Sequence, residues 1–248
     1  YNICFFHIKN FANPHVYERY DNSQISLTSF HEIIKDLKNN QIESIIMAGN
    51  IKRPSMKDIK FDLTTIKLIK NFLLESKGDD QLLKSISSFF YQNGFPLFDW
   101  KIICSELFSL ENILTTNKPT KEALKNKDKG LQVFKAIGKS DVGQSLIIQN
   151  QLILGIECIE GTDELIKRCG DYKKKGDRGV LLKLSKYNQH SDLDIPTIGI
   201  NTVKKLIKYN YEGVFLEKNQ CIIIDKLNII NYCNSNNLFI STIQKIDQ

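Results

Sequence analysis

Two aspartates, Asp192 and Asp194, stand two residues apart in a segment that continues through Pro196 and Thr197. In an extended segment the side chains at positions i and i+2 point to the same side, so these two carboxylates can act together. Such a pair suits a hard divalent cation or the activation of a water molecule, and the hydroxyl of Thr197 can bond to a phosphate oxygen. An ordinary capped loop before a helix accounts for the same residues, and the pattern alone leaves both interpretations open.

In a second segment of this kind a predicted strand ends at Glu157, and Glu160, Gly161, Thr162 and Asp163 then open a predicted helix. Either Thr162 or Asp163 is a natural helix N-cap, and the free N–H groups of a first helical turn can bind an anion. Two acidic side chains beside a phosphate group would require a cation between them. Capping by itself explains this segment equally well.

Two further segments lie in the first half of the chain. In AGNIKRP, residues 48–54, Gly49 lets the backbone approach a ligand, Asn50 offers a donor and an acceptor, and Arg53 can pair with phosphate. A plain turn is the favoured interpretation there, and in KGDD Asp79 can simply cap a helix. The sequence contains no GxGxxG, P-loop, GxSxG or HExxH motif, so the usual signals of four enzyme classes are missing.

The predicted strands and helices that must position these residues alternate along the chain, as in an α/β protein. Short runs of β-branched residues predict strands, and apolar residues at helical spacing predict helices between them. A turn at Asn150 joins two of the strands into a hairpin. The expected helices cover residues 30–37, 63–74, 82–89 and 122–137, and the expected strands cover residues 3–6, 44–47, 144–149, 152–157, 179–184, 213–216, 221–224 and 238–240.

The polar segment at residues 115–121 contains Pro119 and lacks periodicity, which is typical of a linker. We therefore expect two α/β domains, residues 1–114 and residues 122–248. The second domain carries both aspartates of the first candidate site.

Composition narrows the class of protein further. The 248 residues are 42% hydrophobic and 25% charged, as in ordinary globular proteins, and no apolar stretch reaches the length of a membrane span. The net charge of +6 is concentrated in a basic run at residues 167–178, which can face phosphates or an anionic membrane, or can be a solvated loop. Without an aromatic and basic stacking motif, nucleic-acid binding is disfavoured. Six cysteines without CxxC spacing indicate buried thiols in a reducing cytoplasm.

Taken together, these segments resemble one family along the whole chain, the LpxI-type UDP-2,3-diacylglucosamine pyrophosphatases of lipid A biosynthesis. The resemblance is carried, in order, by FANP, AGNIKRP, KGDDQLL, DVGQS, ECIEGTDELIKR, GVLLKLSK and DIPTIG. It implies a cytoplasmic Mg²⁺-dependent hydrolase of lipid metabolism that splits UDP-2,3-diacylglucosamine into UMP and 2,3-diacylglucosamine 1-phosphate (lipid X). It also implies a homodimer of two-domain chains, with a Rossmann-like N-terminal domain and peripheral contact with the inner membrane surface.

The same resemblance implies roles for individual residues. The aspartate that opens the D-[LIV]-P-T-I-G motif is essential in this family and corresponds to Asp194 here. We therefore expect Asp194 to bind the metal or to orient the attacking water, with Asp163 as a second candidate metal ligand. The candidate substrate-binding residues are Asn50, Asp79, Gln144, Thr162, Asp163, Lys183, Lys186, Gln189 and Thr197.

Departures from the family pattern support an alternative to the hydrolase function. Family members usually begin with a strand and a Gly-rich loop of the type LGIIAGGG, and the sequence starts after that point, so we expect an incomplete N-terminal domain. Where members read KPxQDxRxD, this chain has His190 in place of an acid and Asp192 in place of an arginine. An anion in place of a cation should repel a pyrophosphate unless Mg²⁺ or a lysine compensates. The alternative is a non-catalytic protein that binds a sugar nucleotide or lipid and keeps the fold.

Overall fold

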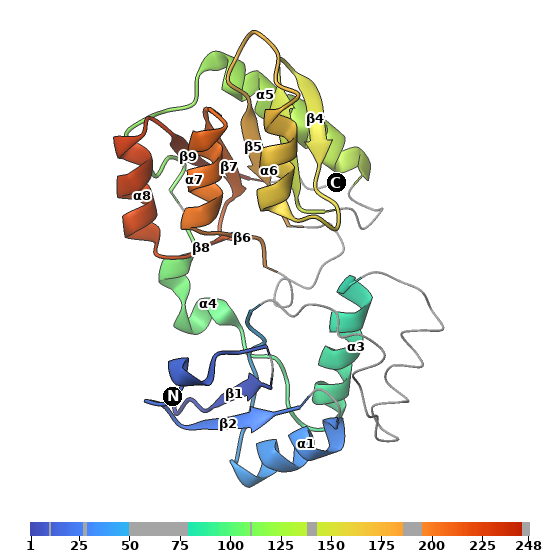
Figure 1. The fold of residues 1–248 in the computed structure, drawn as a ribbon. Helices are drawn as coiled ribbons and strands as arrows, with labels where there is room; N and C mark the ends of the chain where they lie inside the picture. Colours follow the sequence, from blue (N-terminus) through green and yellow to red (C-terminus); the bar gives the residue numbers. More distant parts are fainter. Residues whose placement is uncertain are drawn as a thin grey trace. The chain divides into compact units, whose positions relative to one another are not determined.

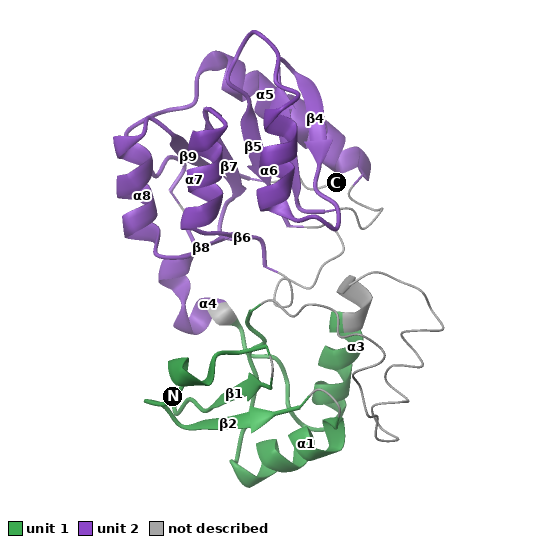
Figure 2. Cartoon of the chain, in the orientation of Figure 1, with its two compact units in different colours: residues 1–99 green, residues 100–248 purple. Residues whose placement is uncertain are grey.

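The computed structural model describes residues 1–9, 11–26, 29–49, 79–109, 111–137, 143–185 and 195–244. These residues form two compact units, Tyr1–Asp99 and Trp100–Gln248, which Figure 2 distinguishes by colour. Both units contain strands and helices, so the predicted pair of α/β domains is confirmed. None of the described helices combines the length and the apolar character needed to cross a bilayer.

The first unit is built on a pair of parallel strands. Its elements are β1 (Phe5–Ile8), the 3-10 helix η1 (Pro14–Val16), β2 (Asn22–Ile25), α1 (Phe30–Asn39) and α3 (Asp79–Gln92). The predicted apolar face of α1 is confirmed, because Phe30, Ile33, Ile34 and Leu37 are all buried and pack with Phe90 of α3. Burial of this face, more than intrinsic helix propensity, holds a helix of this length in place.

The second unit contains a five-stranded sheet in the order β4-β3-β5-β7-β9 (Figure 1). Strands β5, β7 and β9 run parallel, whereas β3 is antiparallel to both of its neighbours. A separate parallel pair is formed by β6 and β8. The elements are α4 (Trp100–Ile103), η3 (Ser105–Leu107), α5 (Lys121–Ile137), β3 (Ser145–Gln149), β4 (Leu152–Ile156), α6 (Thr162–Gly170), β5 (Val180–Lys183), β6 (Thr197–Ile198), α7 (Ile200–Lys208), β7 (Gly213–Glu217), β8 (Ile222–Ile223), α8 (Lys226–Ser235) and β9 (Phe239–Ile243).

Helices cover both faces of this sheet, which explains why its central strands are apolar without interruption. Successive residues of β5 point to opposite faces, so Leu181 packs with residues of α6, α7 and α8 while Leu182 packs with residues of α5. Figure 1 shows α5 on one side of the sheet and α6, α7 and α8 on the opposite side. The arrangement gives three layers and two apolar cores.

Most of the predicted strands are present within one or two residues of their expected ends. The hairpin at Asn150 is confirmed, since Asn150 and Gln151 both adopt positive φ, as a tight two-residue hairpin turn requires. Residues 44–47 form only an isolated bridge, between Ile45 and Leu97. The pattern did not predict β2, whose sequence NSQI has little β-propensity and becomes a strand by pairing with β1. The predicted helix at residues 63–74 lies outside the described residues.

The segment predicted as a linker, residues 115–121, packs within the second unit. Thr120 donates both its backbone N–H and its hydroxyl to the buried carboxylate of Glu212, at 2.8 and 3.1 Å, and Thr116 bonds Asn234 at 2.9 Å. The two units divide instead between Asp99 and Trp100. The polar residues that suggested a linker serve here to hold the entry to α5 against the sheet.

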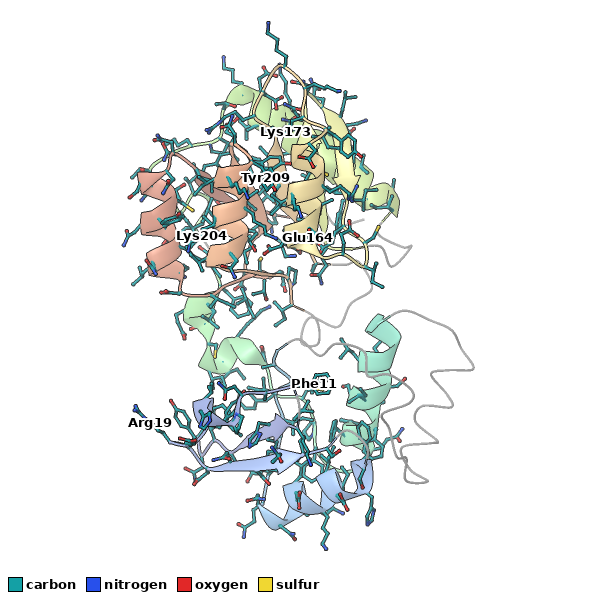
Figure 3. The ribbon with its side chains drawn as sticks, in the orientation of Figure 1. Phe11, Arg19, Glu164, Lys173, Lys204 and Tyr209 are labelled. Carbon is teal, nitrogen blue, oxygen red and sulfur yellow. The ribbon has the colours of Figure 1, made fainter. Side chains whose placement is uncertain are left out.

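Lys173 occupies an unusual position in the loop between α6 and β5, where Figure 3 labels it near Tyr209. Its Nζ donates to the backbone oxygens of Tyr209 (2.9 Å) and Asn210 (2.6 Å) and lies 4.4 Å from the centroid of the Tyr211 ring. Burial, aided by the nearby Arg178, lowers the pKa of Lys173 from its ordinary value of 10.5 to about 8. A neutral amine still has two N–H donors, so it can keep both bonds.

This low pKa predicts how the free energy of unfolding depends on pH. Between about pH 8 and pH 10.5 the unfolded chain binds a proton at Lys173 that the folded chain has lost, so stability rises with pH across that window. The cost of burying the charged amine is fully present below pH 8. Urea unfolding of the chain and of Lys173→Met at pH 7.5, 9 and 10.5 should show the unaltered chain gaining stability relative to the variant. Lys204→Met, at an exposed position on α7, is the control and should leave this slope unchanged.

Candidate active site

One edge of the second unit's sheet collects polar side chains from several elements. The parallel strands β5, β7 and β9 all end there, and the antiparallel register that pairs Ser145 with Lys183 brings the start of β3 to the same edge. Strand β4 also ends there, because Leu146 pairs with Ile156. The carboxyl edge of parallel strands is where open α/β sheets bind ligands.

Lys183 and three of these side chains form a largely buried network. The Lys183 Nζ donates to Thr162 Oγ1 at 2.7 Å and to Ser145 Oγ at 3.2 Å. Thr162 in turn donates its hydroxyl hydrogen to Glu157 Oε1 at 2.9 Å. The second oxygen of Glu157 lies 3.7 Å from Lys183 Nζ, which makes an ion pair, although this buried oxygen accepts no hydrogen bond.

The burial of Lys183 explains why its partners matter. Lys183 is only 3% exposed, and a buried ammonium group is tolerated only with a counter-charge and hydrogen-bond acceptors. The partners are Ser145 at the start of β3, Glu157 directly after β4 and Thr162 at the start of α6, and Lys183 itself ends β5. The site therefore depends on the packing of four separate segments.

Gly143 allows two of these segments to approach closely. Its N–H donates to the backbone oxygen of Glu157 at 3.0 Å, and the N–H of Glu157 donates to the backbone oxygen of Ser145 at 2.9 Å. A Cβ at position 143 would lie 2.3 Å from the Glu157 oxygen, closer than any real contact. The glycine of the DVGQS segment thus lets the end of β4 carry Glu157 into the network.

A second group of polar contacts joins α6 to α7 beside this network. Asp163 accepts a hydrogen bond from the Thr202 hydroxyl at 2.8 Å, and its other oxygen lies 3.8 Å from Lys205. Lys205 also donates to Glu164 at 3.0 Å, and this bond lowers the pKa of Glu164 and raises that of Lys205. Both oxygens of Asp163 therefore have partners on α7.

The end of β7 supports the exit of the chain from β5. Glu217, which is buried, accepts hydrogen bonds from both the backbone N–H and the hydroxyl of Ser185 at 2.7 Å each. Ser185 is the last described residue before position 195. The chain leaving Lys183 is thus anchored to the neighbouring strand.

The structure brings together four of the predicted substrate-binding residues at this edge: Gln144, Thr162, Asp163 and Lys183. Thr197 is exposed in β6, where its hydroxyl donates to the Ile195 oxygen at 2.9 Å, and Asp79 begins α3 in the first unit. Asn50, Lys186, Gln189 and Asp194 lie outside the described residues, as do His190 and Asp192.

Sequence reasoning did not assign Ser145 or Glu157 to the site. Ser145 begins β3 directly after the predicted site residue Gln144, and Glu157 directly follows the last residue of β4. A polar residue at the end of an apolar strand is the signal that could have singled them out. A charged residue at the buried end of an apolar strand requires an oppositely charged partner. For Lys183 at the end of β5, that partner is Glu157, directly after β4.

The described residues do not by themselves form a metal site. Among them, no group of three His, Cys, Asp or Glu side chains is placed to hold a metal ion. The carboxylate of Asp163 is occupied by Thr202 and Lys205, and that of Glu157 faces an ammonium group, which would repel a cation. Mg²⁺ prefers about six oxygen ligands in octahedral geometry, so the described part of this edge does not fit it.

The basic run at residues 167–178 contributes little to this edge. Arg168 bonds the Glu160 carboxylate at 2.7 Å and lowers its pKa, and Arg178 donates to the Asn237 backbone oxygen at 3.2 Å. The loop that carries Arg178 precedes β5, so it lies at the opposite end of that strand from Lys183. Arg168 and Arg178 are therefore not directed at the network around Lys183.

The fold and this edge define a two-domain α/β protein with a candidate ligand site, a cluster of polar side chains at the carboxyl ends of parallel strands. Models of the LpxI N-terminal domain and the LpxI C-terminal domain match residues 1–107 and residues 110–241, and the chain belongs to the LpxI family. It is 28% identical over 240 residues to the UDP-2,3-diacylglucosamine pyrophosphatase LpxI of Caulobacter vibrioides, a match that covers 94% of this chain and 85% of that protein.

Proposed function

We propose that this protein hydrolyses the pyrophosphate bond of UDP-2,3-diacylglucosamine to give UMP and 2,3-diacylglucosamine 1-phosphate. Family membership and the name of the Caulobacter relative support this assignment. The observation that carries it is the meeting of Thr162, Asp163 and Lys183, which come from two separate motifs of the chain, at one edge of the sheet.

The chemistry of this edge suits an anionic substrate. Cleavage of a pyrophosphate increases negative charge on the leaving phosphate, and a fixed cation in a region of low dielectric stabilises that charge. The buried ammonium group of Lys183 provides such a cation at this edge of the sheet. Its N–H groups point at Thr162 and Ser145. The first turn of α6 has no side-chain cap, so its backbone N–H groups can also bond a phosphate oxygen.

We further propose, from the family resemblance alone, that the reaction requires Mg²⁺ and that Asp194 binds the metal or orients the attacking water. Bound Mg²⁺ would neutralise charge on the pyrophosphate. The described residues do not fit the ion by themselves, and Asp163 would have to leave Thr202 and Lys205 to join it.

The test of the function is the release of UMP from UDP-2,3-diacylglucosamine by the purified full chain. We expect UMP and 2,3-diacylglucosamine 1-phosphate in equal amounts with Mg²⁺, loss of turnover with a chelator, and recovery when Mg²⁺ is added back. Circular dichroism recorded with the chelator should match that of the untreated protein. Calorimetric binding of the substrate with no product under any metal condition would instead support the non-catalytic alternative.

We propose a cytoplasmic homodimer that meets its lipid substrate at the inner membrane surface. The exposed Lys174 and Lys175 are available to an anionic surface, which supports the membrane contact. Sedimentation equilibrium and co-sedimentation with anionic vesicles test the two statements; a monomer, or equal binding to neutral vesicles, would contradict them.

A further inference from the structure

We propose that Glu157 is a positioning residue, which holds the ammonium group of Lys183 and the hydroxyl of Thr162 in one fixed arrangement at the carboxyl edge. Glu157 follows β4 directly and reaches both groups, with its Oε1 2.9 Å from Thr162 Oγ1 and its Oε2 3.7 Å from Lys183 Nζ. Its side chain is 13% exposed, so it lies beneath the surface of the edge.

The charge of Glu157 keeps Lys183 in place. Among the described residues, Glu157 is the carboxylate that forms an ion pair with Lys183, whose side chain is 4% exposed. Removing one partner of a buried pair leaves the other charge without compensation, which is strongly unfavourable. Without Glu157 the ammonium group would therefore turn towards solvent, away from Ser145 and Thr162.

Glu157 also determines the direction of the Thr162 hydroxyl. A carboxylate only accepts hydrogen bonds, so the Thr162 hydrogen points at Glu157 and the oxygen lone pairs face Lys183. The Ser145 hydroxyl lies 3.3 Å from Thr162 Oγ1 and can donate to it. The direction of the Thr162 hydrogen is thus set by a group that can only accept. A glutamine at position 157, which can also donate, would remove that constraint.

The role towards the substrate rests on the function proposed above, whereas the holding of Lys183 does not. If Thr162 and Lys183 face the pyrophosphate, Glu157 acts on the reaction through them without contacting the substrate. A glutamine in its place keeps the size of the side chain and the acceptor for Thr162 but removes the counter-charge. Glu157→Gln therefore tests the loss of the counter-charge without a change in the size of the packed side chain.

The first measurement is the reaction of individual lysines with acetic anhydride, followed by mass spectrometry of the full-length protein's peptides. In the unaltered chain Lys183 should react far more slowly than the exposed Lys204. In Glu157→Gln, easier local opening should raise the Lys183 rate about tenfold and leave the Lys204 rate unchanged. The control is Glu122→Gln, which removes a carboxylate paired with Lys125 at 2.9 Å on an exposed face of α5 and should change neither rate.

The second measurement compares the kinetics of the same variants on UDP-2,3-diacylglucosamine. Misplacement of substrate-facing groups should lower kcat/KM of Glu157→Gln by about 10- to 100-fold, while Glu122→Gln keeps the value of the unaltered chain. A slow Lys183 reaction in Glu157→Gln would overturn the inference, as would unchanged kcat/KM in an active enzyme. If the unaltered chain shows no turnover but Lys183 becomes reactive in Glu157→Gln, the proposed function fails and the holding of Lys183 stands.

Discussion

Asp194→Asn is expected to lower turnover of UDP-2,3-diacylglucosamine by at least about 10³-fold while the protein stays folded. The proposed role of Asp194 is to bind the metal or to orient the attacking water, and groups that act directly on the nucleophile commonly contribute up to about 10⁴-fold. An amide has nearly the same size as the carboxylate but cannot accept a proton or neutralise a cation. Initial rates of UMP release at saturating Mg²⁺, with thermal unfolding measured alongside, test this expectation.

Two further variants make this test specific. Asp171→Asn changes an exposed aspartate after α6 and should keep the rate of the unaltered chain. Asp192→Asn separates the two sequence hypotheses, because the paired-carboxylate interpretation requires its loss to slow the reaction, whereas the family pattern carries an arginine at that position. Full activity of Asp194→Asn would rule out the proposed role.

Lys183→Met is expected to have the second large effect, on both stability and activity. The variant leaves the Glu157 carboxylate buried without its counter-charge, and breaking a buried pair in this way costs about 3–5 kcal/mol of unfolding free energy. It also removes the cation proposed to stabilise the cleaved pyrophosphate. Urea unfolding followed by circular dichroism measures the first effect, and UMP release at a temperature where the variant is folded measures the second.

The double variant Glu157→Gln/Lys183→Met identifies the cause of the instability. If the uncompensated carboxylate is responsible, removing it should restore part of the stability lost in Lys183→Met, because the two side chains are in contact and their effects are not additive. Strictly additive losses would show that the ion pair contributes nothing. Lys204→Met, with the same chemical change at an exposed position of α7, should unfold like the unaltered chain.

Much of the second unit could be predicted from local patterns. The apolar run at residues 144–149, the turn at Asn150 and the helical spacing at residues 122–137 correspond to β3, the hairpin and α5. These elements are long, regular and marked by turn residues at their ends, so periodicity identifies them. The two-residue strand β6 and the polar strand β2 carry no such pattern and exist only through their pairing partners.

The sequence predicted only part of the candidate site, because the side chains of the site also meet through strand pairing. Thr162, Asp163 and Lys183 were identified through family motifs, but the motifs say nothing about which other side chains complete the network. Ser145 and Lys183 are 38 residues apart and meet because β3 and β5 pair in one particular antiparallel register. A shift of that register by one residue would turn Lys183 to the opposite face of the sheet.

The sequence by itself determined the α/β class, the positions of most helices and strands, and membership of a family through the order of its motifs. These properties depend on residues that are neighbours along the chain and on the order of whole segments. The sequence shows both directly. The tertiary structure alone decided that Glu157 and Ser145 surround Lys183, that Asp163 is held by α7, and that Arg178 lies at the far end of β5. Those outcomes depend on strand order and register, which follow from packing between segments distant in sequence, and so no local pattern contains them.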